Sequence, residues 1–214
     1  MSRHSPHRPH QEKGGRVATE RNEFERATWR VMVAAVVEPE RLVFVDECGT
    51  HTSLAPIYGY APRGERLRLW VPRKRGKNTT LLSSMSSTGM GPSMAVEGAT
   101  TARVFETYVE KVLVPSLEEG QVVVMDNLGA HRPKGIRELI EQRGCELLYL
   151  PAYSPDYNPI EEAFAKIKNL LRKAAARSKE ALVEAISVAL SAITAQDARG
   201  FFEHVGYRPT AHLL

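Results

Sequence analysis

The chain has 214 residues, of which 43% are apolar and 25% charged, with a formal net charge of +4 and an isoelectric point of about 9.1. This is typical of one globular domain with a small extension. Two cysteines exclude a disulfide framework or a cysteine-rich zinc cluster, and no apolar run approaches the roughly 20 residues that span a bilayer. We therefore expect a cytoplasmic protein with no membrane partner, and the excess of positive charge favours an anionic partner.

Residues 1–40 are predicted to be a flexible, basic leader with one short helix, acting as a linker or a remnant. The first 22 residues are too polar to pack a core, and they lack the apolar segment of a secretory signal. Phe24, Trp29 and Val33 then recur at helical spacing, which predicts a helix over 23–37. The main domain is expected over 41–207, with a tail at 208–214.

The first half of that domain reads as short strands. The run Leu42–Val45 is β-branched and aromatic, which predicts a buried strand that ends at Asp46. Further strands are expected over 67–71, 79–84 and 93–96, the last after a turn at 89–92. Because these segments are close in sequence, they are expected to form an antiparallel meander.

The second half alternates helices and strands. Helices are expected over 101–117 and 133–143, the second ending at Gly144, and a continuous apolar strand over 121–125 ends at Asp126. A strand over 146–150 and helices over 159–176 and 178–195 follow, with Ser178 capping the last. The fold class is therefore α/β, a mixed sheet flanked by helices.

Asp46 and Asp126 each follow an apolar strand, and ligands of open α/β sheets gather at the carboxyl ends of strands. Such an aspartate also serves as a turn former or a helix cap. For Asp126 a binding role is favoured, because Asn127 and His131 follow it directly after a buried strand, which is costly unless these groups bind something. His131 is either a contact to phosphate or metal-bound water, or a structural histidine.

Glu161 begins the helix predicted after Asn158-Pro159-Ile160. Asn158 as N-cap, Pro159 at the first position and Glu161 at the third match a capping box. That interpretation is compatible with a second one, in which Glu161 points into a cleft. Lys168 and Arg172 share its helix face.

Three carboxylates without a histidine or cysteine cluster suit Mg²⁺ or Mn²⁺ rather than zinc. Two such ions about 4 Å apart activate an attacking oxygen and stabilise the leaving oxygen of a phosphodiester. Asp46, on the first strand, is the candidate to bridge both ions.

Three blocks carry a resemblance to a known family: Leu42-Val43-Phe44-Val45-Asp46-Glu47, Val123-Val124-Met125-Asp126-Asn127 with His131, and Tyr153-Ser154-Pro155-Asp156-Tyr157-Asn158-Pro159-Ile160-Glu161. With 34 residues between Asp126 and Glu161, the chain resembles the DDE transposases of the insertion-sequence 630 family, relatives of mariner elements.

The resemblance implies a ribonuclease-H-like catalytic domain for metal-dependent DNA cleavage and strand transfer, with Asp46, Asp126 and Glu161 as catalytic residues and metal ligands. It implies double-stranded DNA as partner, a homodimer assembled on DNA and a nucleoid-associated location. Glu47 faces the other side of its strand and is left out of the site. Relatives resemble two helix-turn-helix modules followed by this core, so we expect the downstream half of a split reading frame or a truncated copy, served by a separate helix-turn-helix subunit.

Two basic clusters are candidate DNA contacts, although a charge run is usually a solvated face. The first is predicted to be a strand-turn-strand element along the phosphate backbone, in which Trp70 either stacks on a base or, as the favoured interpretation, packs in the core. The second lies on the helix after Glu161. The residues proposed for DNA binding are Arg63, Arg66, Arg68, Arg73, Lys74, Arg75, Lys77, Lys168 and Arg172, with Asn127 and His131 as possible auxiliary residues of the site.

Two alternatives stay open. A ribonuclease-H-like nuclease would cut RNA–DNA hybrids or junctions without joining ends. An inactive transposase remnant would only bind DNA or a partner protein.

Overall fold

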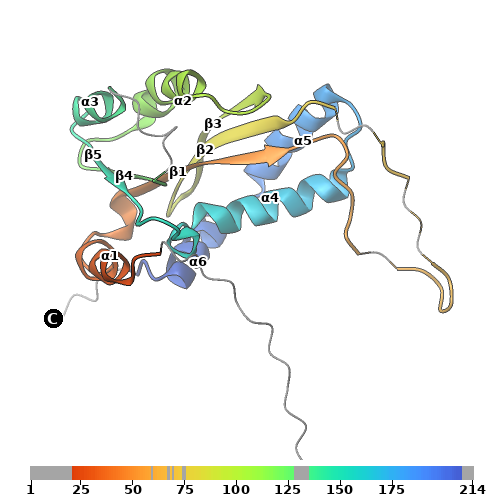
Figure 1. Ribbon diagram of the computed structural model, residues 1–214, viewed down its shortest axis with the longest axis horizontal. Coiled ribbons are helices and arrows are strands. Elements are labelled where there is room, and N and C mark those ends of the chain that lie inside the picture. The colour runs from red at the N-terminus through yellow and green to blue at the C-terminus, as the bar shows by residue number, and fades with distance from the viewer. Residues whose placement is uncertain are drawn as a thin grey trace, which may run out of the picture.

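The computed structural model describes residues 21–58, 60–66, 68, 70–73, 76–127 and 135–208. One five-stranded sheet in the order β3-β2-β1-β4-β5 forms its centre (Figure 1). The first three strands are antiparallel neighbours, whereas β1, β4 and β5 run parallel, which confirms the predicted meander and the ribonuclease-H-like mixed sheet. The strands are β1 (Leu42–Thr50), β2 (Thr79–Ser86), β3 (Gly89–Glu97), β4 (Val122–Met125) and β5 (Glu146–Tyr149).

β1 is longer than predicted and does not end at Asp46. Its parallel pairing with β4 stops at Val45↔Met125, but its antiparallel pairing with β2 continues to Thr50↔Thr79. Asp46 therefore lies inside a strand, at the point where the neighbouring strand β4 ends. The prediction was wrong because a partner strand, not apolarity, extends β1.

Three further predictions fail in the stretch from the end of β1 to the start of β3. The described residues of the predicted strand at 67–71 are not in a strand, and neither are the other described residues of the long connection at 51–78, which we call the arm. The side chain of Trp70 is 92% exposed, so its predicted core packing is wrong. The predicted turn at 89–92 is part of β3, because the chain already turns at Ser87 and Thr88.

Helices cover both faces of the sheet (Figure 1). One face packs against α2 (Ala102–Tyr108), the π-helical turn Val109–Leu113 that extends it, and α3 (Ile136–Glu141). The other face packs against α1 (Glu23–Trp29), α4 (Ile160–Ala174), α5 (Lys179–Ser191) and α6 (Ala195–Val205).

The predicted helices are confirmed with shorter bounds, and Ser178 caps α5 as expected. Residues 133 and 134 of the third predicted helix lie outside the described part. α1 is not separate from the body, because Trp29 and Val33 are buried in the same core as Phe44 of β1.

α6 was not predicted from the sequence, which includes Gly200, a weak helix former. Burial of Ala198 and Phe202, together with a capping box between Thr194 and Asp197, stabilises it. Phe202 meets the ring of Phe44 edge-on at 5.4 Å. Among the described residues no single helix is long and apolar enough to cross a membrane; only α5 and α6 together, bent by 74°, meet that criterion.

Candidate active site

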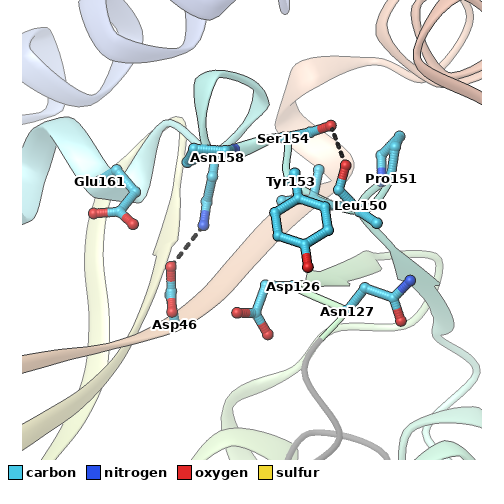
Figure 2. A pocket seen from close by; sticks show the side chains of 11 residues that line it. Asp46, Asp126, Asn127, Leu150, Pro151, Tyr153, Ser154, Asn158 and Glu161 are labelled. Atoms are coloured by element: carbon cyan, nitrogen blue, oxygen red, sulfur yellow. Dashed lines mark hydrogen bonds between the residues drawn. The ribbon is translucent and has the colours of Figure 1, made fainter. Parts of the chain in front are cut away.

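A cavity of about 410 Å³ lies where β4 ends and α4 begins. It is lined by residues of segments that are distant in the sequence (Figure 2). The three predicted carboxylates all belong to this lining, as does the auxiliary Asn127. The lining residues are Asp46, Asp126, Asn127, Leu150, Pro151, Ala152, Tyr153, Ser154, Pro155, Asn158 and Glu161.

Strand alternation brings the two aspartates together. Along β1 and β4, Phe44 and Val124 point into the core under α4, whereas Val45 and Met125 point to the opposite face. Asp46 and Asp126 follow Val45 and Met125, the last paired residues of two parallel strands, so they are neighbours at a strand spacing of about 4.8 Å. By the same alternation Glu47 faces away, as predicted.

Asp46 is almost fully buried, with 7% of its surface exposed. Its Oδ1 accepts a hydrogen bond from the backbone N–H of Glu47 at 2.7 Å, and its Oδ2 accepts one from Nδ2 of Asn158 at 2.8 Å. Each carboxylate oxygen therefore has a donor that fixes its direction, and Figure 2 shows the one from Asn158.

Asn158 was not predicted as a site residue, and the capping box proposed for it is wrong. Its side chain, 3% exposed, turns to Asp46 instead of the helix, and Pro159 precedes the first residue of α4 without a side-chain cap. The backbone carbonyl of Asn158 still accepts from the N–H of Glu161 at 3.2 Å. A polar side chain before a helix is usually a cap, so the local sequence could not reveal this long-range contact.

Glu161 lies in the first turn of α4, is exposed and reaches the cavity, as predicted for the third acid. The neighbouring Glu162 points elsewhere, because its Oε1 contacts Nδ1 of His204 on α6. The two adjacent glutamates are thus separated by the helix geometry, and of the two only Glu161 lines the cavity.

Tyr153 adopts a left-handed backbone conformation, with φ of 54°, which costs a residue with a Cβ roughly 1–2 kcal/mol. The side chain is 57% exposed and extends toward Asp126 and Asn127 in Figure 2. Strained residues of this kind cluster at functional sites.

The donor set fits Mg²⁺ or Mn²⁺. The described lining residues supply three carboxylates and the amide of Asn127, all hard oxygen donors, and none of these described residues is a histidine or cysteine. Within the described ranges, no three His, Cys, Asp or Glu side chains are close enough to surround one ion. Mg²⁺ accommodates this, because it usually binds one or two carboxylates and completes its shell with water and substrate phosphate oxygens.

The structure does not bring the described basic residues of the arm to the cavity. The described arginines of the arm are exposed, and the arm extends away from the body beyond α4 (Figure 1). They lie on irregular chain instead of the predicted strand-turn-strand element. These arginines are Arg63, Arg66, Arg68 and Arg73.

Contacts at the base of the arm hold its two ends against α5 and β3. Nη1 of Arg177 donates to the carbonyls of Thr52 and Leu54 at 2.9 and 2.8 Å. Glu97 pairs with Lys179 at 2.6 Å and with Lys77 at 2.8 Å. The hydrogen bonds from these two lysines, Lys179 first, lower the pKa of Glu97 to about 2. Lys77 is thus part of the arm's anchorage.

Of the predicted contacts on α4, Lys168 lies nearer the site. Burial raises the pKa of the Cys48 thiol, and the ammonium of Lys168 beside it only partly offsets that effect. Cys48 is two residues beyond Asp46 on the same face of β1, and neither Cys48 nor Lys168 is among the described lining residues of the cavity. Arg172, one turn further, donates to Oδ1 of Asn169 at 2.7 Å. His131, Lys74 and Arg75 lie outside the described residues.

The fold and the cavity define a ribonuclease-H-like domain with an acidic site of the magnesium type. A Mos1 transposase paired-end complex with the left transposon end matches 92% of this chain and 64% of that chain, with a TM-score of 0.69 and 20% identity. The catalytic domain of Mos1 mariner transposase matches 91% of this chain and 93% of that chain, with a TM-score of 0.61 and 16% identity. Mos1 paired-end complexes are known with Mn and with Mg.

Two relatives that are similar in sequence are also transposases. The Tcb2 transposase of Caenorhabditis briggsae is 27% identical over 109 residues, 49% of this chain and 40% of the relative. The Tc1 transposase of Caenorhabditis elegans is 26% identical over 122 residues, 55% of this chain and 45% of the relative. The chain thus spans less than half the length of these two relatives.

The model of the DDE superfamily endonucleases matches residues 41–183, and the chain belongs to this family. Within this family, the chain is similar in sequence to the Tc1 transposase and in fold to the catalytic domain of Mos1 mariner transposase.

Proposed function

We propose that this domain cuts DNA and joins the freed 3′ ends to target DNA, with Asp46, Asp126 and Glu161 as the catalytic metal ligands. The observation that carries the proposal is the convergence of these three carboxylates, from β1, from the end of β4 and from α4, on one cavity. Chance rarely brings three acids of separate elements together, because their mutual repulsion costs stability unless a cation offsets it.

Asp46 is proposed to bridge two ions, because it is the most buried of the three acids and both its oxygens are held in fixed directions. Asp126 and Glu161 would each complete one of the two ion sites. When bound, the ions supply activation of the attacking oxygen and stabilisation of the leaving oxygen of a phosphodiester. The residues themselves orient these donors, and the N–H groups of Glu47 and Asn158 stabilise the negative charge of Asp46.

Double-stranded DNA is the proposed substrate, with the arginines of the arm and Lys168 and Arg172 on α4 as phosphate contacts. These residues are positive and, on the arm, exposed, which suits salt-sensitive and sequence-tolerant binding. Assembly of two copies on paired ends, a separate helix-turn-helix subunit and association with the nucleoid are further parts of this proposal.

The test is nicking of supercoiled plasmid by the purified protein in Mg²⁺ or Mn²⁺, followed by strand transfer from a donor with free 3′ ends. We expect metal-dependent nicking that EDTA stops and that Asp46→Ala, Asp126→Ala and Glu161→Ala each abolish. Glu162→Ala is the matched control, since Glu162 contacts His204 and should retain activity.

The outcomes separate the alternatives. If Glu161→Ala retains activity and Glu162→Ala loses it, the third ligand is Glu162 and the assignment to Glu161 is wrong. Nicking without strand transfer would favour a plain ribonuclease-H-like nuclease. DNA binding without any metal-dependent cleavage, even with a helix-turn-helix subunit added in trans, would identify an inactive remnant.

A further inference from the structure

Directly behind the cavity, α1 contacts the loop that leads into α4. Arg26 of α1 is 1% exposed and donates from Nη1 and Nη2 to the two carboxylate oxygens of Asp156, at 3.0 and 2.6 Å. Its guanidinium also lies 4.1 Å from the ring centre of Tyr157. Such a bidentate pair with a stacked ring fixes both residues of the loop in direction as well as distance.

A second chain of hydrogen bonds ends at the same loop. Nε1 of Trp29 donates to the hydroxyl of Tyr207 at 2.8 Å, and that hydroxyl donates to the backbone carbonyl of Tyr157 at 2.8 Å. All three side chains are buried. α1 and the segment after α6 therefore hold the backbone at Tyr157 together.

The residue after Tyr157 is Asn158, which donates to Oδ2 of Asp46 at 2.8 Å. The positions of Asp156 and Tyr157 determine where the amide of Asn158 points. Burial alone would raise the pKa of Asp156, but the hydrogen bonds and charge of Arg26 outweigh it and hold that pKa below its ordinary value. Asp156 is therefore ionised at neutral pH, and the contact is a full ion pair.

We propose that Arg26 and Trp29 of α1 are positioning residues of the active site, which act through Asp156, Tyr157 and Tyr207 to hold Asn158 against Asp46. The inference rests on the proposed metal-binding role of Asp46. Both Arg26 and Tyr207 lie outside the stretch 41–183 that matches the family model. The site thus depends on contacts made from either side of the matched core.

A merely stabilising role for these contacts would lower the melting temperature and leave metal affinity unchanged. Positioning predicts a change in metal affinity, because side chains that orient a metal ligand change its affinity about 10- to 100-fold when they are removed. Arg26 acts one contact further out than Asn158, so we expect roughly a tenfold loss, at the lower end of that range.

The test measures Mn²⁺ binding to the whole chain without DNA, from the electron paramagnetic resonance signal of free Mn²⁺. Arg26→Met removes the charge and keeps the length of the side chain, and Trp29→Phe removes the N–H and keeps a ring. Each should weaken Mn²⁺ binding, whereas Arg41→Met, which removes the hydrogen bond from Arg41 to the carbonyl of Gly120 far from the cavity, should not. Asp156→Asn, at a half-exposed carboxylate, serves if Arg26→Met does not fold.

The decisive variant combines Arg26→Met with Asn158→Ala. If Arg26 acts through Asn158, the double variant binds Mn²⁺ no more weakly than Asn158→Ala alone. The proposal would be overturned if the losses of Mn²⁺ affinity in the two single variants multiply in the double variant. It would also be overturned if Arg26→Met and Trp29→Phe fold and bind Mn²⁺ with unchanged affinity. A complete lack of Mn²⁺ binding by the unaltered protein would overturn it as well. If the variants weaken Mn²⁺ binding as expected but the unaltered protein cuts no DNA, even with a helix-turn-helix subunit added in trans, the proposed function is refuted and the positioning role is supported.

Discussion

Replacing Tyr153 with glycine should make the protein more stable and less active. Tyr153 has φ of 54°, a conformation that glycine adopts without strain. Because the side chain is 57% exposed, its removal gives up little buried surface. The ring lines the cavity, however, and we expect its absence to slow metal-dependent nicking.

The magnitude follows from two opposing terms. Relief of the left-handed conformation contributes about 1–2 kcal/mol. The greater freedom of glycine in the unfolded chain costs about 0.4–1 kcal/mol. The net gain is therefore on the order of 0.5–1 kcal/mol, which raises the melting temperature by roughly 1–4 °C for a chain of this size.

Ala175 provides a matched control, because it is the other described non-glycine residue with positive φ, at 49°. It ends α4, and its side chain is only a methyl group. Ala175→Gly should raise the melting temperature by a similar amount and leave nicking unchanged. Calorimetry on both variants checks this. A lower melting temperature for Tyr153→Gly together with a higher one for Ala175→Gly would refute the reasoning that relief of backbone strain at Tyr153 outweighs the loss of its side-chain contacts.

Three further predictions test other parts of the molecule. Phe202→Ala should destabilise the protein by about 3–5 kcal/mol in denaturant titrations, because it empties the buried contact with Phe44; a change below about 1 kcal/mol would mean that α6 is not part of the core. Changing the four described arginines of the arm to glutamine should reduce the slope of log Kd against log salt concentration by about 0.9 for each phosphate that these arginines neutralise. Fluorescence anisotropy with duplex DNA measures this slope, and Arg103→Gln on α2 should leave it unchanged. An unchanged slope in the arm variant would show that the arm is not part of the DNA-binding surface. The hydrogen bond from Lys166, and then those from Thr194, lower the pKa of Asp197 to about 2. The ionised carboxylate therefore contributes its full stability above the ordinary pKa of 3.8 and loses that contribution as pH falls toward 2. Asp197→Asn should reduce the fall in melting temperature between these pH values, and an unaltered fall would contradict the assignment.

The sequence was sufficient where one local pattern decides the outcome. The apolar runs at 42–45 and 121–125 correctly predicted the buried strands β1 and β4, which pair in parallel. Ser178 caps α5 as its local sequence predicts, and its hydroxyl accepts from the N–H of Ala181. The resemblance implies Glu161 as the third acid, and this residue does line the cavity.

Prediction failed where a distant residue competes with a local signal. Asn158 and Glu161 have the sequence of a capping box, but the buried carboxylate of Asp46 takes the amide instead. The residues after Asp46 are not an apolar run, and β1 continues through them only because β2 offers a partner. Trp70 was expected to pack in the core, but it is exposed on the arm. The neighbouring residues in the sequence could not predict any of these three outcomes.

The bond between Trp29 and Tyr207 joins residues that are 178 positions apart. Contacts over such a separation close late, because the intervening loop must first be ordered. During synthesis, Trp29 of α1 cannot form this hydrogen bond until Tyr207 has been made, near the end of the domain. The loop that orients Asp46 is then completed last, so a nascent chain has its sheet before it has a competent site. Hydrogen exchange during refolding should show protection of Val123 and Val124 in β4 earlier than protection of the loop at 154–158.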